Sequence, residues 1–227
     1  MNLFKKILIL IPFALAIGTM QAEAFTAAFP TSVQEKQQSM GQLVSSRGMS
    51  LDDRYPITSV NTVFRDNILL TLAYLSGAVT NPSQIKWDNI RKPSTYVMTL
   101  QPGEVFAFHD DVLPEFAGKH IITTNAHFGA DQGFEYDGDL YGDGVCHFAT
   151  LINWAAQDAG LKVVAPTRHD FAKIPDIDPK YGTAIYYNAG DSGVNEAQNL
   201  YVENNFDKSV KLVFTYAHDT LTVSVYK

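Results

Sequence analysis

Cys146 and His169 are the residues whose types and spacing could together carry covalent chemistry. Cys146 follows a Gly-rich stretch and opens a segment with apolar residues at helical spacing, so it is predicted to lie in the first turn of a helix. Unpaired backbone N–H groups and the helix dipole favour a thiolate there. A cysteine nucleophile also needs a base. His169 follows 23 residues later, past one predicted helix and one strand, from where the chain could return beside Cys146.

The same reasoning assigns supporting roles to residues around this pair. Backbone N–H groups at the start of the helix, from Cys146 or His147, would stabilise an oxyanion. The His147 side chain is the poorer base, because neighbours on a helix point about 100° apart. The other candidates are Gly144, in the loop before the helix, and three possible orienting carboxylates for His169, among which the sequence does not choose: Asp170, Asp176 and Asp178.

Other interpretations of these residues stay open at this stage. A lone cysteine is often a small buried apolar residue, and the nearby Asp139 and Asp143 would raise its pKa. The acidic, Gly-rich stretch 131–143 could offer oxygen ligands to Ca²⁺, but it lacks EF-hand spacing. Zinc would need Cys146 together with histidines that show no C-x-x-C or H-x-x-x-H spacing. We therefore assign no metal and no cofactor.

Two helices and several strands are predicted to position the candidate site. Residues 60–75 carry apolar side chains at spacings of three and four, and Gly77 ends that pattern. The cysteine helix extends to about residue 159 before Gly160. Strands are predicted at 95–100, 105–108, 161–164, 182–187, 200–204, 210–217 and 220–226. The residues Gln101-Pro102-Gly103-Glu104 suit a type II turn.

These elements indicate a single α+β domain in which the helix that carries Cys146 packs on an antiparallel sheet. The last two strands should form a hairpin in that sheet. We expect the domain to span residues 59–227, with a partly flexible leader at 25–58 that includes a weak helical pattern at 33–44.

The first 24 residues read as a secretory signal peptide. Lys5 and Lys6 precede a short apolar run, and Ala22-Glu23-Ala24 offers small residues at the cleavage site. The run is shorter than the ~20 residues that a comfortable membrane span needs, although an uncleaved anchor is the alternative. We expect cleavage after Ala24, secretion or periplasmic localisation, and no stable membrane insertion afterwards.

The net charge limits which macromolecules the protein can bind, and the cysteine content limits how the fold can be cross-linked. The net charge of −7 becomes −8 without the signal peptide, which removes two lysines and one glutamate. An acidic domain is a poor ligand for nucleic acid. The single cysteine excludes an intramolecular disulfide, so the fold depends on its core.

Three segments together resemble the VanW-like family. The stretch Pro102-Gly103-Glu104-Val105-Phe106-Ala107-Phe108 is similar to the family's PGE-x-F-S-F motif, and Arg65 with Asn67-Ile68 resembles its R-x-x-N-I helix. Residues 142–151 resemble its GGG-V-C-Q-x-S-T-x-L motif, with Asp143 in place of a glycine and His147 in place of the glutamine. Residues 159–169 and 200–205 resemble its later motifs, and 182–185 echo its D-A-T-V segment.

The resemblance implies a cell-envelope protein and brings no established reaction. The helix at Cys146 also looks like the nucleophile helix of transglutaminase-like and papain-like enzymes. Two functions follow as expectations. The chain could be a Cys–His enzyme that acts on amide bonds of peptidoglycan or protein. Alternatively, it is a non-catalytic module that binds cell-wall polymer or an envelope protein.

Overall fold

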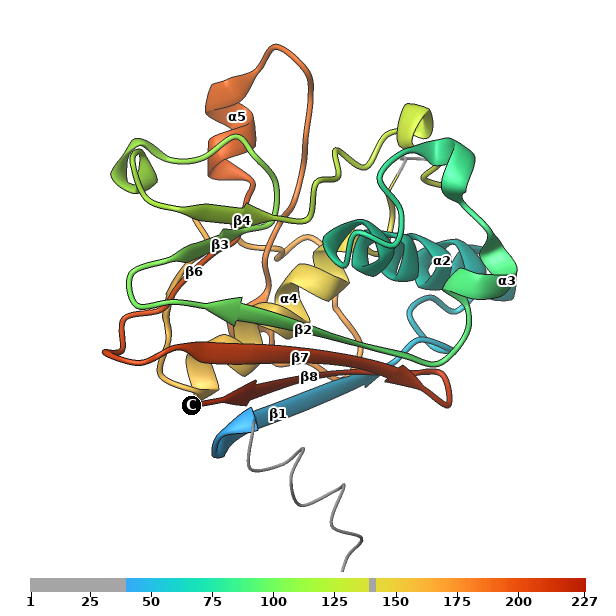
Figure 1. Ribbon diagram of the computed structural model, residues 1–227. Helices are drawn as coiled ribbons and strands as arrows, with labels where there is room; N and C mark the ends of the chain where they lie inside the picture. Colours follow the sequence, from blue (N-terminus) through green and yellow to red (C-terminus); the bar gives the residue numbers. More distant parts are fainter. Residues whose placement is uncertain (1–39, 139–141) are drawn as a thin grey trace, which may run out of the picture.

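The computed structural model describes residues 40–138 and 142–227. It confirms one α+β domain, in which a large and a small sheet lie on either side of a central helix (Figure 1). The predicted signal peptide, and the part of the leader before residue 40, lie outside the described residues.

The large sheet is antiparallel and has the order β1-β8-β7-β2. Its strands are β1 (Leu43–Ser50), β2 (Ser94–Leu100), β7 (Val210–Ala217) and β8 (Thr220–Tyr226). The predicted terminal hairpin is confirmed, since β7 pairs with β8 from Ala217↔Thr220 to Lys211↔Tyr226. Beside β8 on its other edge, the residue before β1 continues the pairing: the backbone groups of Gln42 and Lys227 exchange two hydrogen bonds of 2.9 Å.

The small sheet has the order β4-β3-β6-β5. Its strands are β3 (Val105–Ala107), β4 (Ile121–Thr123), β5 (Lys162–Val164) and β6 (Tyr201–Glu203). Only the β3–β4 pair is parallel. Between β2 and β3, Gly103 adopts a φ of +79°, as the third residue of a type II turn requires. That turn carries the chain from the large sheet to the small one.

The central helix is α4 (Val145–Asp158). It packs against β1 and β8 of the large sheet and β5 of the small one, which confirms the predicted packing of the cysteine helix on the terminal hairpin. Phe148 links the two layers: its ring meets those of Phe108, next to β3, and Phe214, on β7, edge to face at 5.9 Å each. The core therefore forms around α4.

Helix α2 (Thr58–Leu75) lies beside α4, with the short α3 (Trp87–Ile90) next to it (Figure 1). Arg91, just after α3, forms an ion pair with the fully buried Asp66 of α2. The described residues also form helix α5 (Ser192–Ala197) and four 3-10 turns: η1 (Pro82–Gln84), η2 (Pro114–Phe116), η3 (Ala130–Gln132) and η4 (Pro179–Tyr181).

Two predictions are wrong. Residues 43–50, which we assigned to a partly flexible leader, form β1, so the fold begins before the expected boundary at residue 59. This also excludes a helix at 43–44. Residues 182–187 form no strand; they run extended beside α4, and the Thr183 N–H donates to the Thr150 hydroxyl at 3.0 Å. On one side of this segment, side chains of α4 accept the backbone hydrogen bonds that a neighbouring strand would otherwise accept.

In the part of the chain that the structure describes, no helix is both long and apolar enough to cross a membrane.

Candidate functional site

The loop before α4 fits its surroundings through glycine. Gly144 precedes the first residue of α4 with a φ of +98°, and a Cβ at this position would lie 2.6 Å from the Phe64 carbonyl oxygen on α2. Only glycine combines this φ with so close an approach of two backbones. The position of Cys146 in the first turn of α4 therefore depends on contact between α2 and the loop.

Asn67 fastens the same loop to α2. Its buried side-chain amide donates to the carbonyl oxygens of Glu135 and Asp143, at 3.1 and 3.0 Å, and its Oδ1 accepts from the Glu135 N–H at 2.8 Å. One side chain thus satisfies three backbone groups within the acidic stretch 131–143.

The Cys146 thiol is held between the two backbone groups of one residue. The Ile185 N–H donates to Sγ at 3.3 Å, and the thiol can donate to the Ile185 carbonyl oxygen at 3.5 Å. Ile185 belongs to the extended segment that we expected to be a strand. The sequence carries no signal for this contact, because it depends on how that segment lies along α4.

Burial raises the pKa of the Cys146 thiol to about 11. The hydrogen bond from Ile185 lowers this pKa in part, whereas the negative charge of Asp143 raises it further. Desolvation therefore outweighs the helix N-terminus, and the neutral thiol is the stable form at neutral pH.

His147 and His169 form a pair of buried imidazoles. They are 5% and 7% exposed, and their rings meet edge to face with centroids 6.1 Å apart. Neither Nδ1 atom has a hydrogen-bond partner. Among the described residues no hydrogen bond joins His169 to Cys146, whose hydrogen bonds both go to Ile185. The structure thus brings His169 beside His147, and the catalytic pairing of His169 with Cys146 stays a prediction.

The electrostatics of this pair favour neutral imidazoles. Burial first, and then the positive charges of Arg54 and His169, together lower the pKa of His147 to about 3. Burial also lowers the pKa of His169, although the nearby backbone of His169 and Ala172 and the charge of Asp170 raise it in part.

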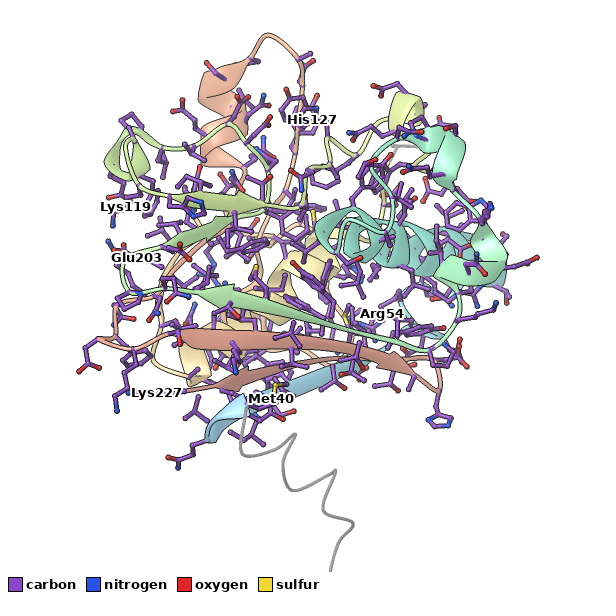
Figure 2. The ribbon with its side chains drawn as sticks, in the orientation of Figure 1. Met40, Arg54, Lys119, His127, Glu203 and Lys227 are labelled. Carbon is purple, nitrogen blue, oxygen red and sulfur yellow. The ribbon has the colours of Figure 1, made fainter. Side chains whose placement is uncertain are left out.

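The three candidate carboxylates lie in different settings. Asp176 forms an ion pair with the fully buried Arg54 at 3.0 Å. Asp178 caps η4 by accepting from the Lys180 N–H at 3.0 Å. Asp170 follows His169 directly in the chain, and both residues line a pocket beside Thr150 of α4. Figure 2 shows Arg54 near α2, and composition alone gave no reason to expect a core residue in the predicted leader.

The pair formed by His127 and Asp110 was not predicted. His127 Nε2 lies 2.8 Å from Asp110 Oδ1, and the His127 ring stacks on Tyr187 with centroids 3.8 Å apart. His127 lies at the top of the molecule in Figure 2. Tyr187 follows Ile185 by two residues. The extended segment that bonds the Cys146 thiol through Ile185 therefore also contacts His127 through Tyr187.

The described residues do not gather metal ligands at one place. Within residues 40–138 and 142–227, no group of three or more His, Cys, Asp or Glu side chains is placed to hold a metal ion. Asp139, one of the four aspartates considered for Ca²⁺, lies outside those ranges.

Comparison with known proteins identifies the family. The family model described as "VanW like protein" matches residues 86–226, which is more than half of the chain. The matched part includes α4 with Cys146 and His147, as well as His169 and Ile185. No curated protein and no solved structure matches the chain. The sequence motifs and this match agree, and the chain belongs to the VanW-like family.

Proposed function

We propose that this chain is an exported, non-catalytic binding module of the cell envelope. The observation that carries the proposal is the state of Cys146: a half-buried cysteine whose thiol is held by both backbone groups of Ile185 and whose pKa is raised to about 11. A nucleophilic cysteine has to form a thiolate near neutral pH, and the surroundings of such cysteines lower the thiol pKa. The surroundings of Cys146 raise it. The partner class is cell-wall polymer or an envelope protein.

The rate at which the thiol is alkylated tests this proposal. Because the chain has a single cysteine, the iodoacetamide label reports on Cys146 alone. We expect slow labelling from pH 6 to 9, rising only at higher pH or after denaturation. Cys146→Ser should retain binding to purified wall sacculi. Rapid labelling at pH 7, with an apparent pKa below the ~8.5 of free cysteine, would contradict the module.

A second experiment tests the enzyme hypothesis directly, in which Cys146 is the nucleophile and His169 the base. That hypothesis requires Cys146→Ser and His169→Ala each to abolish a change in peptidoglycan fragments that the unmodified protein produces. Incubation with such fragments, followed by mass spectrometry, would detect a lost or joined peptide. We expect no mass change with any fragment, with or without the substitutions.

Export is a separate prediction. Cleavage after Ala24 leaves Phe25 as the first residue of the protein recovered from the envelope or medium. Intact mass spectrometry measures this directly. A product that keeps residues 1–24 and sediments with membranes would show that the segment is an anchor instead.

A further inference from the structure

Strand β2 forms an edge of the large sheet, and the register shows which of its backbone groups face outward (Figure 1). The two residues between Ala217 and Thr220 both have positive φ, so this pair closes the β7–β8 hairpin by exchanging hydrogen bonds. Bonded and non-bonded pairs alternate along an antiparallel ladder. Followed along β7 and across to β2, this alternation directs the N–H and C=O groups of Thr95, Val97 and Thr99 away from β7. Among the described residues, no hydrogen bond satisfies them.

Strand β2 lacks the features that usually protect an edge strand from pairing. Its seven residues include no charge and no proline, and its register with β7 is unbroken. The opposite edge differs, because β1 carries Arg47 and has a register shift between Leu43 and Ser45. Val97, in the middle of β2, is 38% exposed. Of the two edges, β2 is therefore the one that accepts an added strand more easily.

A cavity of about 620 Å³ lies where β2 begins, between this strand, the end of α2 and α3. Small-molecule sites in proteins usually measure roughly 300–1,000 Å³. The lining is mainly apolar and includes Leu72, Val79, Ile90 and Tyr96. Thr95, whose backbone groups face outward, also lines this cavity. A strand added along β2 would therefore bring one of its ends to the cavity.

The charge at this end of β2 favours an anionic group. Of the described residues that line the cavity, only Lys86 is charged, and its side chain is exposed. Residues 86–92 also include Arg91, which is already in an ion pair, and Lys92, against the single acid Asp88. In a chain with a net charge of −7, this is a locally basic spot. A carboxylate is the anion that a polypeptide offers at its own end.

We propose that β2 binds the C-terminal end of an extended protein chain. The chain would add to the sheet antiparallel to β2, with its last side chain in the cavity and its carboxylate on Lys86. Strand addition to an open edge and capture of a terminal carboxylate are both general ways to bind a peptide. The inference rests on the proposed function, since it names the site and ligand class of that binding module.

A second copy of this chain fits the same edge less well. Its own β2 continues into the turn after Leu100 and offers no carboxylate, so the cavity and Lys86 would stay unused. Two chains of net charge −7 also repel each other.

The test is a titration followed by ¹⁵N–¹H NMR, with the full-length protein. The probe is an acetylated peptide of alternating threonine and valine that ends in leucine with a free carboxylate. We expect saturable shifts in residues 94–100 and slower hydrogen exchange at Thr95, Val97 and Thr99, because the added strand would bond their N–H groups. The same peptide with a C-terminal amide should bind roughly fivefold more weakly, which is the size expected of an exposed ion pair.

Matched variants separate the carboxylate from the strand. Lys86→Gln should remove the preference for the acid over the amide. Lys92→Gln is the control, since this exposed lysine of the same segment does not line the cavity, and it should keep the preference. On the peptide, N-methylation of the amides that face β2 should abolish binding, whereas methylation of the amides that face away should not. The methylated peptides test strand addition without altering the protein.

Four outcomes would overturn the inference. They are an absence of saturable shifts, equal affinity for acid and amide, equal effects of the two methylation patterns, and tighter binding of muropeptides released from purified sacculi, which would assign the site to wall polymer. A dimer in size-exclusion chromatography, with the outward amides of β2 already protected, would assign the edge to a second copy.

The labelling rate of Cys146 does not depend on this titration, so the two proposals fail separately. A reactive thiol with peptide binding at β2 would refute the non-catalytic module alone. An inert thiol with no binding at β2 would refute the inference alone.

Discussion

At the scale of single residues, burial decides the chemistry of the first turn of α4. Helix N-termini stabilise thiolates, and the sequence places Cys146 at such a position. Withdrawal from water works in the opposite direction, and it raises the pKa of the thiol to about 11. Burial acts on the adjacent His147 in the opposite sense, since it lowers the pKa of a cationic acid to about 3. Both side chains are therefore neutral at neutral pH.

The neutral His147 makes stability depend on pH. Its pKa is near 6.5 when unfolded and about 3 when folded, so the unfolded chain takes up the proton first. Its contribution is complete above pH 6.5 and is lost as the pH falls toward 3. For this residue the free energy of unfolding should drop by about 2 kcal/mol between pH 7 and pH 5. The lowered pKa of His169 acts in the same direction.

Urea unfolding at pH 7, 6 and 5 measures this effect. His147→Gln, which introduces the residue that the family motif carries, should flatten the profile, and the substitution of the exposed His120 by Gln serves as the control. A profile with the same slope in His147→Gln would show that other groups cause the acid sensitivity.

At the scale of elements, α4 is positioned by a loop that α2 holds in place. The three hydrogen bonds of Asn67 and the close approach of Gly144 to Phe64 make this loop a part of the α2 surface. The N-terminus of α4 should therefore loosen when α2 loses its grip on the loop, even though no residue of α4 changes.

Asn67→Ala tests this coupling. The substitution leaves three backbone groups without partners and should lower the free energy of unfolding by about 2–4 kcal/mol. It should also speed the labelling of Cys146 in the folded protein. Asn89→Ala, at an exposed position of α3, should stay within about 0.5 kcal/mol of the original. Unchanged labelling in Asn67→Ala would mean that the loop does not control access to the thiol.

Sequence patterns predicted the elements whose own residues carry the signal. The helical spacing of apolar residues identified α2 and α4, and alternating residues identified β7 and β8. The same patterns missed β1, where only Ser45 and Met49 are buried in an otherwise polar edge strand. They also mistook residues 182–187 for a strand, because β-branched and aromatic residues suit any extended segment. The environments of Cys146 and His169 depend on that segment, and the sequence could not provide them.

At the scale of the whole molecule, β1 closes the large sheet and covers part of α4. Removing β1 would leave the backbone of β8 as an open edge. It would also remove the buried Met49 side chain and expose the core residues that pack against it. A chain that begins at Leu51 should therefore be less stable than one that begins at Met40 by at least about 3 kcal/mol, from lost apolar burial and strand pairing.

Urea midpoints of the two chains, with size-exclusion chromatography to detect association through β8, measure this difference. The chain that begins at Met40 is the control because it keeps all of β1. Equal midpoints would mean that β1 is an accessory strand and that the domain is complete from residue 51.

The pairing of Gln42 with Lys227 determines how the molecule responds to tension. These residues form the first rung between β1 and β8, and the two strands run antiparallel from there. A pull between residue 42 and residue 227 would load these hydrogen bonds one pair after another, like a zipper, and would separate the strands at low force. A pull from residue 42 against the far end of β8 would load the whole ladder in shear. The fold is thus mechanically weak along one axis and strong along another.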